Sequence, residues 1–184
     1  GHAGTLPQIF KKCGFDYYCF MRPGAHEKDL PGQAFWWESP DGSRVLTYRI
    51  PPGYTTRGVD HREHIDKALE DKPEVLSHTM SFFGVGNHGG GPTRAQIENV
   101  RELAAQGQGA DIRFSHPAAY FAAIAQEAQA LPVVREEMQH HAVGCYSVVS
   151  VLKQMHRQAE CALLVAERMA SLANVWTGQT IPLS

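Results

Sequence analysis

The sequence is poor in features that would assign a protein to a class at once. Its four cysteines, Cys13, Cys19, Cys145 and Cys161, have no CxxC spacing, so we expect reduced thiols and a cytoplasmic location rather than a disulfide framework. No apolar run approaches the roughly 18 residues that suggest a membrane span. The formal net charge of −2 favours neither nucleic acid nor a membrane surface as a partner. What remains is the composition of an ordinary globular protein.

Short apolar runs alternate with helical patterns along residues 1–131. We expect strands at 16–21, 78–86, 111–115 and on both sides of a turn at 41–42, and helices at 59–69, 92–106 and 117–131. Thr93 and Gln96 have the spacing of a capping box at the start of the second helix. The alternation of strands and helices indicates an α/β fold with a parallel sheet.

The pattern changes after Pro132. Residues 133–147 read as an irregular connector, and from Val148 to Ala173 apolar residues recur at helical spacing. A single helix with one apolar stripe needs partners that cover the stripe. We therefore expect two parts, an α/β domain at 1–131 and, at 132–184, a connector followed by a long helix.

The stretch GVGNHGGGPTR, at 84–94, is the most informative local feature. An expected strand leads into it and a helix follows, which is where open α/β folds place their ligands. Glycines let a backbone approach a ligand closely, and a helix N-terminus favours negative charge. The spacing matches neither a Walker loop nor the dinucleotide fingerprint. A plain turn, a polar ligand site presenting Asn87 and His88, and a phosphate loop all remain open.

Ten histidines are candidates for metal ligands. His61 and His64 lie three residues apart on an expected helix, but no third ligand is adjacent in the sequence, so we expect a solvated helix face. His140 and His141 are neighbours in the connector and cannot easily bind one metal from a regular element. We expect a structural or surface role for this second pair.

Two further positions could contact a ligand. Trp36 and Trp37 are consecutive in an expected strand, so one ring is expected in the core and the other in a sugar-stacking or second packing face. Arg22 ends a buried strand, and strand carboxyl ends form the catalytic edge of α/β folds. It is either a surface charge or a clamp for a carboxylate. These residues alone indicate a carbohydrate- or phosphate-handling α/β domain.

Four stretches occur in order along the chain: GHAGTLPQIFKKCGFDYYCFMRP, FWWESPDGSRVLTYR, GVGNHGGGPTR and GCYSVVSVLKQMHRQAE. Together they resemble the bacterial α-mannosidases of glycoside hydrolase family 38, over nearly the whole chain to about Ala173. The resemblance implies part of a seven-stranded, largely parallel, barrel-like α/β domain at 1–131. It also implies that 132–184 contains the first long helix of a three-helix bundle.

The chemistry implied by this resemblance is zinc-dependent, retaining hydrolysis of α-mannosides. An aspartate that also binds the zinc attacks the anomeric carbon, while a second carboxyl group acts as acid and then as base. The zinc orients the sugar and stabilises charge. The resemblance places this aspartate three residues before Gly1, and it places the other zinc ligands outside the chain. We therefore expect no tightly held zinc and no turnover by these 184 residues alone.

The resemblance also assigns individual residues to the reaction. Asn87 and His88 lie where many members have the acid/base aspartate, and of the two only His88 can transfer a proton. His2 is expected to shape the metal site without binding the metal. Arg22 matches an arginine that holds the nucleophile ionised. Tyr54 falls near a tyrosine that contacts the sugar.

A substrate contact is also expected from Trp37, the tryptophan that we assign to sugar stacking. The hypothesis is therefore an internal part of an α-mannosidase whose partner is an α-mannoside or a mannose-containing oligosaccharide. The alternative is a non-catalytic carbohydrate-binding or assembly module derived from such an enzyme. A phosphate-binding protein is a third hypothesis, with Arg94 as the one basic residue near the glycines. Because an open sheet edge invites pairing, we also expect self-association.

Overall fold

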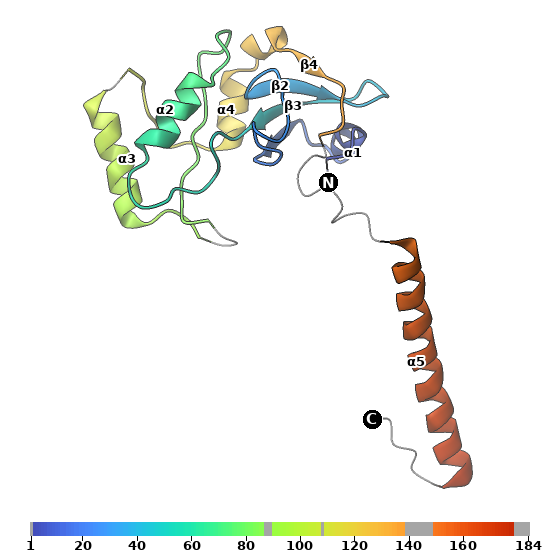
Figure 1. Ribbon diagram of the computed structural model, residues 1–184. Helices are drawn as coiled ribbons and strands as arrows, with labels where there is room; N and C mark the ends of the chain where they lie inside the picture. Colours follow the sequence, from blue (N-terminus) through green and yellow to red (C-terminus); the bar gives the residue numbers. More distant parts are fainter. Residues whose placement is uncertain (1, 87–89, 108, 139–148, 179–184) are drawn as a thin grey trace. The chain divides into compact units, whose positions relative to one another are not determined.

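The computed structural model describes residues 2–86, 90–107, 109–138 and 149–178. The chain divides into two compact units, Gly1–His141 and Ala142–Ser184. The first holds a sheet with its helices, and the second holds one long helix (Figure 1). The first unit extends past residue 131 because Val134 and Met138 pack in its core.

A mixed four-stranded sheet forms the centre of the first unit. The strands are β1 (Tyr17–Phe20), β2 (Ala34–Glu38), β3 (Arg44–Arg49) and β4 (Val133–Val134), in the order β1-β3-β2-β4. β1 is parallel to β3 and β4 is parallel to β2, whereas β2 and β3 form an antiparallel hairpin. The α/β class is confirmed, but these four strands do not confirm a seven-stranded, largely parallel barrel.

The hairpin turns where the sequence predicts, at Asp41–Gly42. Gly42 has a φ of 83°, a conformation that glycine adopts without strain. The Asp41 carboxylate accepts hydrogen bonds from the backbone N–H and the hydroxyl of Ser43, both at 3.0 Å. This is the local bonding that makes Asp-Gly a frequent turn sequence.

Alternation along the strands gives the sheet two buried faces. One face carries the cluster Ala34, Leu46, Tyr48, Leu76, Tyr120, Phe121, Ile124, Ala128 and Leu131. It includes side chains of α4 (Pro117–Ala123) and of the 3₁₀ turn η1 (Glu127–Ala130). The other face carries Phe20, Phe35, Trp37, Val45, Val134 and Met138, with Leu6 and Phe10 of α1 (Leu6–Lys12) packed against them. Burial of apolar side chains on both faces stabilises this unit.

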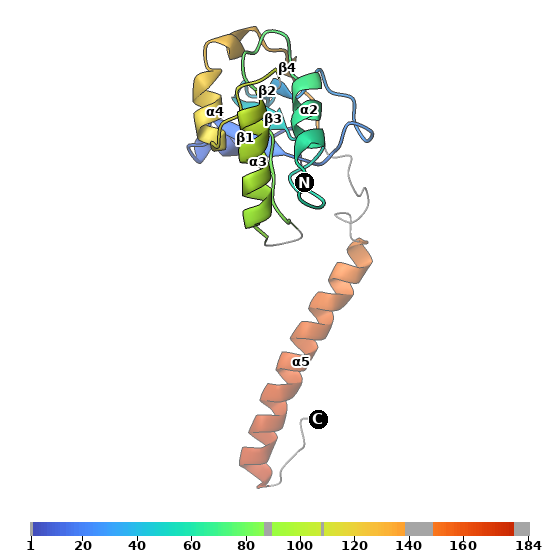
Figure 2. The ribbon, with the colours of Figure 1, turned by 90° about the vertical axis from the view of Figure 1, so that its left-hand side faces the viewer.

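Two further helices, α2 (Arg62–Glu70) and α3 (Arg94–Gln106), lie side by side (Figures 1 and 2). The Asn99 side chain of α3 accepts a hydrogen bond from the backbone N–H of His61, at 2.9 Å. α3 begins with the predicted capping box, in which Thr93 Oγ1 accepts from Gln96 N and Gln96 Oε1 accepts from Thr93 N. It ends at Gly107, whose φ is 60°.

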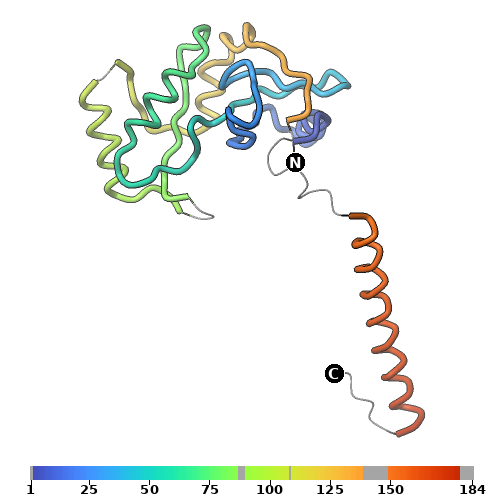
Figure 3. Tube along the Cα trace, viewed as in Figure 1, coloured from blue at the N-terminus to red at the C-terminus, as the bar shows by residue number. Residues whose placement is uncertain are grey.

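Two expected strands are wrong. Residues 78–86 run extended past α2 (Figure 3), and neither they nor 111–115 form a named strand. Side-chain hydrogen bonds, and not hydrogen bonds to a neighbouring strand, hold residues 78–86. For example, the Tyr48 hydroxyl accepts from Met80 N at 3.2 Å. The expected helix at 117–131 is interrupted at Ile124 and continues as η1.

The second unit contains α5 (Ser150–Thr177), a helix of 28 residues that confirms the prediction of a long helix here. Ala170 is its one buried residue, while Leu152, Met155, Leu163 and Met169 are exposed. Its apolar side chains therefore have no cover within the part of the chain that the structure describes. Across the same described residues, no helix has both the length and the apolar character needed to cross a membrane.

Candidate functional site

Three segments meet beyond the carboxyl ends of β1 and β3, which lie at one edge because the two strands are parallel. The backbone N–H of Ile50 donates to the carbonyl of Phe20 at 2.8 Å, and Thr56 N donates to Gly84 O at 2.9 Å. A Cβ placed on Gly53 would lie 3.2 Å from Met21 Sδ. The residues after β1, the segment 50–56 and the segment 84–86 are therefore in contact. This is the edge at which α/β folds bind ligands.

Arg22 follows β1 at this edge, and its side chain is 46% exposed. Its Nη1 lies 3.4 Å from Glu27 Oε2, the oxygen that also accepts from Gly24 N at 2.7 Å. Because the Arg22 side chain is exposed and the separation is long, this pair contributes at most about 1 kcal/mol. The guanidinium can therefore exchange Glu27 for another carboxylate at small cost.

Tyr54 lies in the segment that follows β3, and its side chain is exposed. The next residue, Thr55, approaches Gly86 so closely that a Cβ on Gly86 would overlap the Thr55 methyl group. A Cβ on Gly90 would lie 2.6 Å from Val85 Cβ. These glycines are thus required by contacts within the protein, an explanation that needs no ligand. Asn87 and His88 lie outside the described residues.

The two tryptophans face opposite sides of β2, as predicted. Trp37 is fully buried, and its indole donates to the Glu136 carbonyl at 2.9 Å. A ring enclosed in this way presents no face to a sugar, so the assignment of Trp37 to substrate binding is not supported by its position. Trp36 is partly exposed, but Arg44 lies over its ring at 4.5 Å from the centroid.

His2 lies against the core beneath this edge. Its ring is near those of Phe20, Tyr18 and Trp37, with centroid distances of 5.6, 5.9 and 6.5 Å. Burial lowers the pKa of His2 below its ordinary value because the charged imidazolium loses hydration. A neutral imidazole is therefore favoured at this position.

A polar cluster beside the site was missed by the sequence interpretation. His61 is 2% exposed, with Nδ1 3.0 Å from Thr56 Oγ1 and Nε2 2.9 Å from Ser81 Oγ. The expectation of a solvated helix face is therefore wrong for His61. Burial, with a contribution from nearby His64, lowers the pKa of His61 to about 4. No local sequence signal was available, because the partners of its ring, Thr56 and Ser81, lie 5 and 20 residues away.

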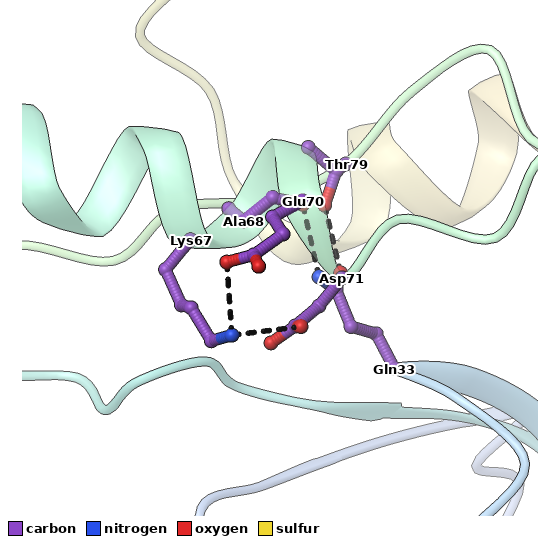
Figure 4. Close-up of polar contacts among 6 residues, drawn as sticks. All are labelled: Gln33, Lys67, Ala68, Glu70, Asp71 and Thr79. Carbon is purple, nitrogen blue, oxygen red and sulfur yellow. Dashed lines mark hydrogen bonds and ion pairs between the residues drawn. The ribbon is translucent and has the colours of Figure 1, made fainter.

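A second polar cluster connects the sheet to the end of α2 (Figure 4). Gln33 Nε2 donates to the Ala68 carbonyl at 2.9 Å, and Gln33 Oε1 accepts from the Thr79 hydroxyl at 2.9 Å. The Tyr48 hydroxyl also donates to Gln33 Oε1, at 2.9 Å. These bonds set the start of the extended segment that leads through Ser81 to the glycine-rich stretch.

The described residues do not by themselves make a zinc site. No three histidine, cysteine, aspartate or glutamate side chains within 2–86, 90–107, 109–138 and 149–178 are grouped so that they could hold a metal ion. His61 and His64 have ring centroids 4.9 Å apart, but both nitrogens of His61 already have hydroxyl partners. His140 and His141 lie outside the described residues.

Comparison with known proteins gives the family. Residues 1–142 match the model of the glycosyl hydrolases family 38 N-terminal domain. The chain is 28% identical over 177 residues to "Alpha-mannosidase 2C1" of Mus musculus and to the protein of the same name of Homo sapiens, matches that cover 94% of this chain. It is 26% identical over 179 residues, 96% of its length, to "Alpha-mannosidase G" of Dictyostelium discoideum.

The matched residues extend over most of the chain and include all three segments at the edge of the sheet. The chain therefore belongs to glycoside hydrolase family 38, and the resemblance seen in the sequence is confirmed. It spans only 16–17% of the length of these relatives.

Proposed function

We propose that the whole protein is a retaining α-mannosidase and that this chain supplies part of its catalytic domain. The family match over residues 1–142 carries the proposal, because it covers the edge formed by β1, β3 and the segments after them. The named relatives are α-mannosidases. An α-mannoside or a mannose-containing oligosaccharide is the proposed substrate, and the proposed location is cytoplasmic.

The residues of this edge have distinct proposed roles. Arg22 holds a substrate-facing carboxylate in its ionised form, which its exposed position and its weak pairing with Glu27 support. The exposed Tyr54 contacts the sugar. His88, beside Asn87, acts as proton donor and acceptor at the acid/base position. The neutral ring of His2 supports the shape of the site from the core.

Zinc is included in this proposal because of the family relationship. The described residues themselves do not fit a zinc site. When bound in the whole protein, the ion would supply charge stabilisation and orientation of the sugar. The resemblance places the zinc ligands and the nucleophile outside these 184 residues. We therefore expect the 184-residue chain alone to hold zinc weakly and to be inactive.

An aryl α-mannoside hydrolysis assay tests the function. The whole protein, made from the complete gene, should release the aryl group, and a chelator should abolish this release until zinc is restored. The 184-residue chain should give no turnover in either condition. A whole protein that is folded and inactive toward α-mannosides contradicts the proposal.

Arg22 gives a sharper test within the whole protein. Arg22→Lys keeps the charge but loses the planar fork that pairs with a carboxylate, and Arg22→Met loses both. We expect kcat to fall in both variants, by about 10²-fold for methionine and less for lysine. Equal kcat in the wild type and Arg22→Met would contradict the proposed role of Arg22 in holding a carboxylate ionised.

One observation favours a second function. The family resemblance aligns Asn87 with the acid/base aspartate of many members, and an amide cannot serve as the general acid. A non-catalytic carbohydrate-binding or assembly module would tolerate this residue. Calorimetric titration of the whole protein with methyl α-mannoside, showing binding in the absence of turnover, would favour the module over the enzyme.

We also propose that the chain self-associates. β1 and β4 are the edges of the described sheet, and exposed strand edges pair readily. The uncovered apolar side chains of α5 support the same expectation. Sedimentation velocity should show species larger than 20.3 kDa, and a single monomer peak would contradict this.

A further inference from the structure

The cluster around His61 joins four separate parts of the first unit. We call Thr56, His61, Ser81, Gln96 and Asn99 the His61 cluster. Thr56 lies in the segment after β3, His61 immediately precedes α2, Ser81 lies in the extended segment, and Gln96 and Asn99 belong to α3. None of these parts pairs with the sheet as a named strand. Their relative positions depend on side-chain hydrogen bonds.

The His61 ring is held at both nitrogens and at its own backbone. Thr56 Oγ1 is 3.0 Å from Nδ1, Ser81 Oγ is 2.9 Å from Nε2, and the backbone N–H donates to Asn99 Oδ1 at 2.9 Å. A neutral imidazole has one donor and one acceptor nitrogen, and hydroxyls satisfy either. The Phe83 ring, with its centroid 5.3 Å away, packs against the imidazole. The orientation of the ring is therefore determined from several directions.

Thr56 connects His61 to the candidate site. Its backbone N–H donates to Gly84 O at 2.9 Å, and Gln96 Nε2 donates to the carbonyl of Gly58 at 2.8 Å. Thr55, the preceding residue, lies in contact distance of Gly86. A shift of Thr56 would consequently move both Tyr54 and the start of the glycine-rich stretch.

We propose that His61 is a positioning residue for the α-mannosidase reaction, a role that rests on the proposed function. It does not touch the substrate. By fixing Thr56 and Ser81, it sets the distance between the segment that carries Tyr54 and the segment 84–86. An error of 1 Å in such a position can cost about 10²-fold in rate, although the fold itself is retained.

Hydrogen exchange in the 184-residue chain tests the positioning directly and needs no activity. In His61→Gln, the amide of Thr56 should exchange about 10-fold faster because its bond to Gly84 is no longer supported. The amide of Leu46, which donates to Asp16 O inside the sheet, should be unchanged. The control is His64→Gln, since His64 Nδ1 is buried without a hydrogen-bond partner in the described structure. Unchanged protection of Thr56 in His61→Gln would overturn the proposal.

Kinetics of the whole protein test the consequence. His61→Gln should lower kcat/KM for an aryl α-mannoside by at least about 10-fold at a temperature where the variant is fully folded, and His64→Gln should stay near the wild type. Thr56→Val, which removes one partner of the ring, should reproduce part of the loss. If the Thr56 amide exchanges faster in His61→Gln but kcat/KM is unchanged, the positioning role is overturned.

The two proposals fail in different ways. If the wild-type whole protein does not hydrolyse α-mannosides, the proposed function fails, and the catalytic meaning of His61 fails with it. The exchange experiment then still decides whether His61 holds Thr56 against Gly84.

Discussion

The first unit has two halves that are held by different kinds of contact. In the sheet half, which comprises α1, the four strands, α4 and η1, large rings are fully buried on both faces, for example Trp37 on one and Phe121 on the other. The sheet half also buries three polar residues, Gln33, Ser39 and Thr47. In the loop half, residues 50–116, Thr56, His61 and Gln96 are the buried polar residues, and the buried apolar ones among the described residues are fewer: Ala68, Leu76, Val100 and Leu103. The loop half therefore has less buried apolar area than the sheet half, and its segments depend more on a few directed hydrogen bonds.

This difference teaches where the candidate site is vulnerable. Apolar packing is distributed over many atoms, so a small error in it is shared by many neighbours. A hydrogen bond between buried groups is lost completely when one partner is removed. Substitutions in the loop half can therefore displace Tyr54 and the segment 84–86 while the sheet stays folded.

The largest expected effect is in the sheet half. Trp37→Ala leaves a cavity in the core and removes the hydrogen bond from the indole to the Glu136 carbonyl, and we expect it to lower the free energy of unfolding by about 4 kcal/mol. Urea denaturation of the 184-residue chain measures this change. Trp176→Ala is the control, because Trp176 is 79% exposed on α5; a similar loss there would contradict the comparison.

The next effect lies at the junction of the two halves. Tyr48→Phe removes the hydroxyl that donates to Gln33 and accepts from Met80 N, so buried polar groups lose a partner. We expect a loss of about 2 kcal/mol in the free energy of unfolding. If Tyr48→Phe leaves urea denaturation unchanged, the loop half is held by something other than these bonds.

The third prediction concerns pH and the His61 cluster. His61 has an ordinary pKa of 6.5 and a folded-state pKa of about 4, lowered by burial and then by His64, while Asp60 acts in the opposite direction. Between these two values the unfolded chain binds a proton that the folded chain does not bind. The free energy of unfolding should therefore fall as pH decreases from 6.5 to 4, by on the order of 2 kcal/mol.

His61→Gln isolates that contribution. Denaturation across the same pH range gives the free energy of unfolding of the wild type and of this variant. The difference between the two should be constant above pH 6.5 and should shrink below it. A difference that does not depend on pH would mean that His61 is not neutral in the folded protein.

The smallest expected effect is a gain in stability. Tyr120 packs edge-on against Tyr48, with centroids 5.2 Å apart, but its buried hydroxyl has no hydrogen-bond partner among the described residues. Tyr120→Phe removes an unsatisfied polar group and should raise the free energy of unfolding by up to about 1 kcal/mol. A clear loss, seen as a lower melting temperature, would show that the hydroxyl has a partner in solution.

The features that the sequence predicted correctly are those in which the partners are close along the chain. The Asp41–Gly42 turn, the capping box of Thr93 with Gln96 and the long helix α5 all depend on residues within one or two turns. The four separated stretches were enough to indicate the family, because their order is itself specific.

The failures have the opposite cause. Residues 78–86 have the apolar pattern of a strand, but Met80 is held by Tyr48, 32 residues away, and not by a neighbouring strand. His61 was expected in solvent because its burial depends on Ser81, 20 residues further along. Trp37 and Trp36 were correctly placed on opposite faces, whereas the pattern could not say that both faces are covered.

Because Thr55 lies so close to Gly86, a harmful substitution at one of these positions should be compensated by a substitution at the other. Gly86→Ala would overlap the Thr55 methyl group, and Thr55→Ser removes that group while keeping the hydroxyl. The serine should therefore act as a second-site suppressor of the alanine. The suppression would be partial, because Thr55 Cβ, which serine keeps, lies 2.8 Å from a Cβ at position 86 and because residue 86 keeps a φ of 71° that strains any residue with a side chain. In a whole protein with the proposed α-mannoside hydrolysis, a genetic screen for restored activity in a Gly86→Ala background should return changes at Thr55 before changes elsewhere.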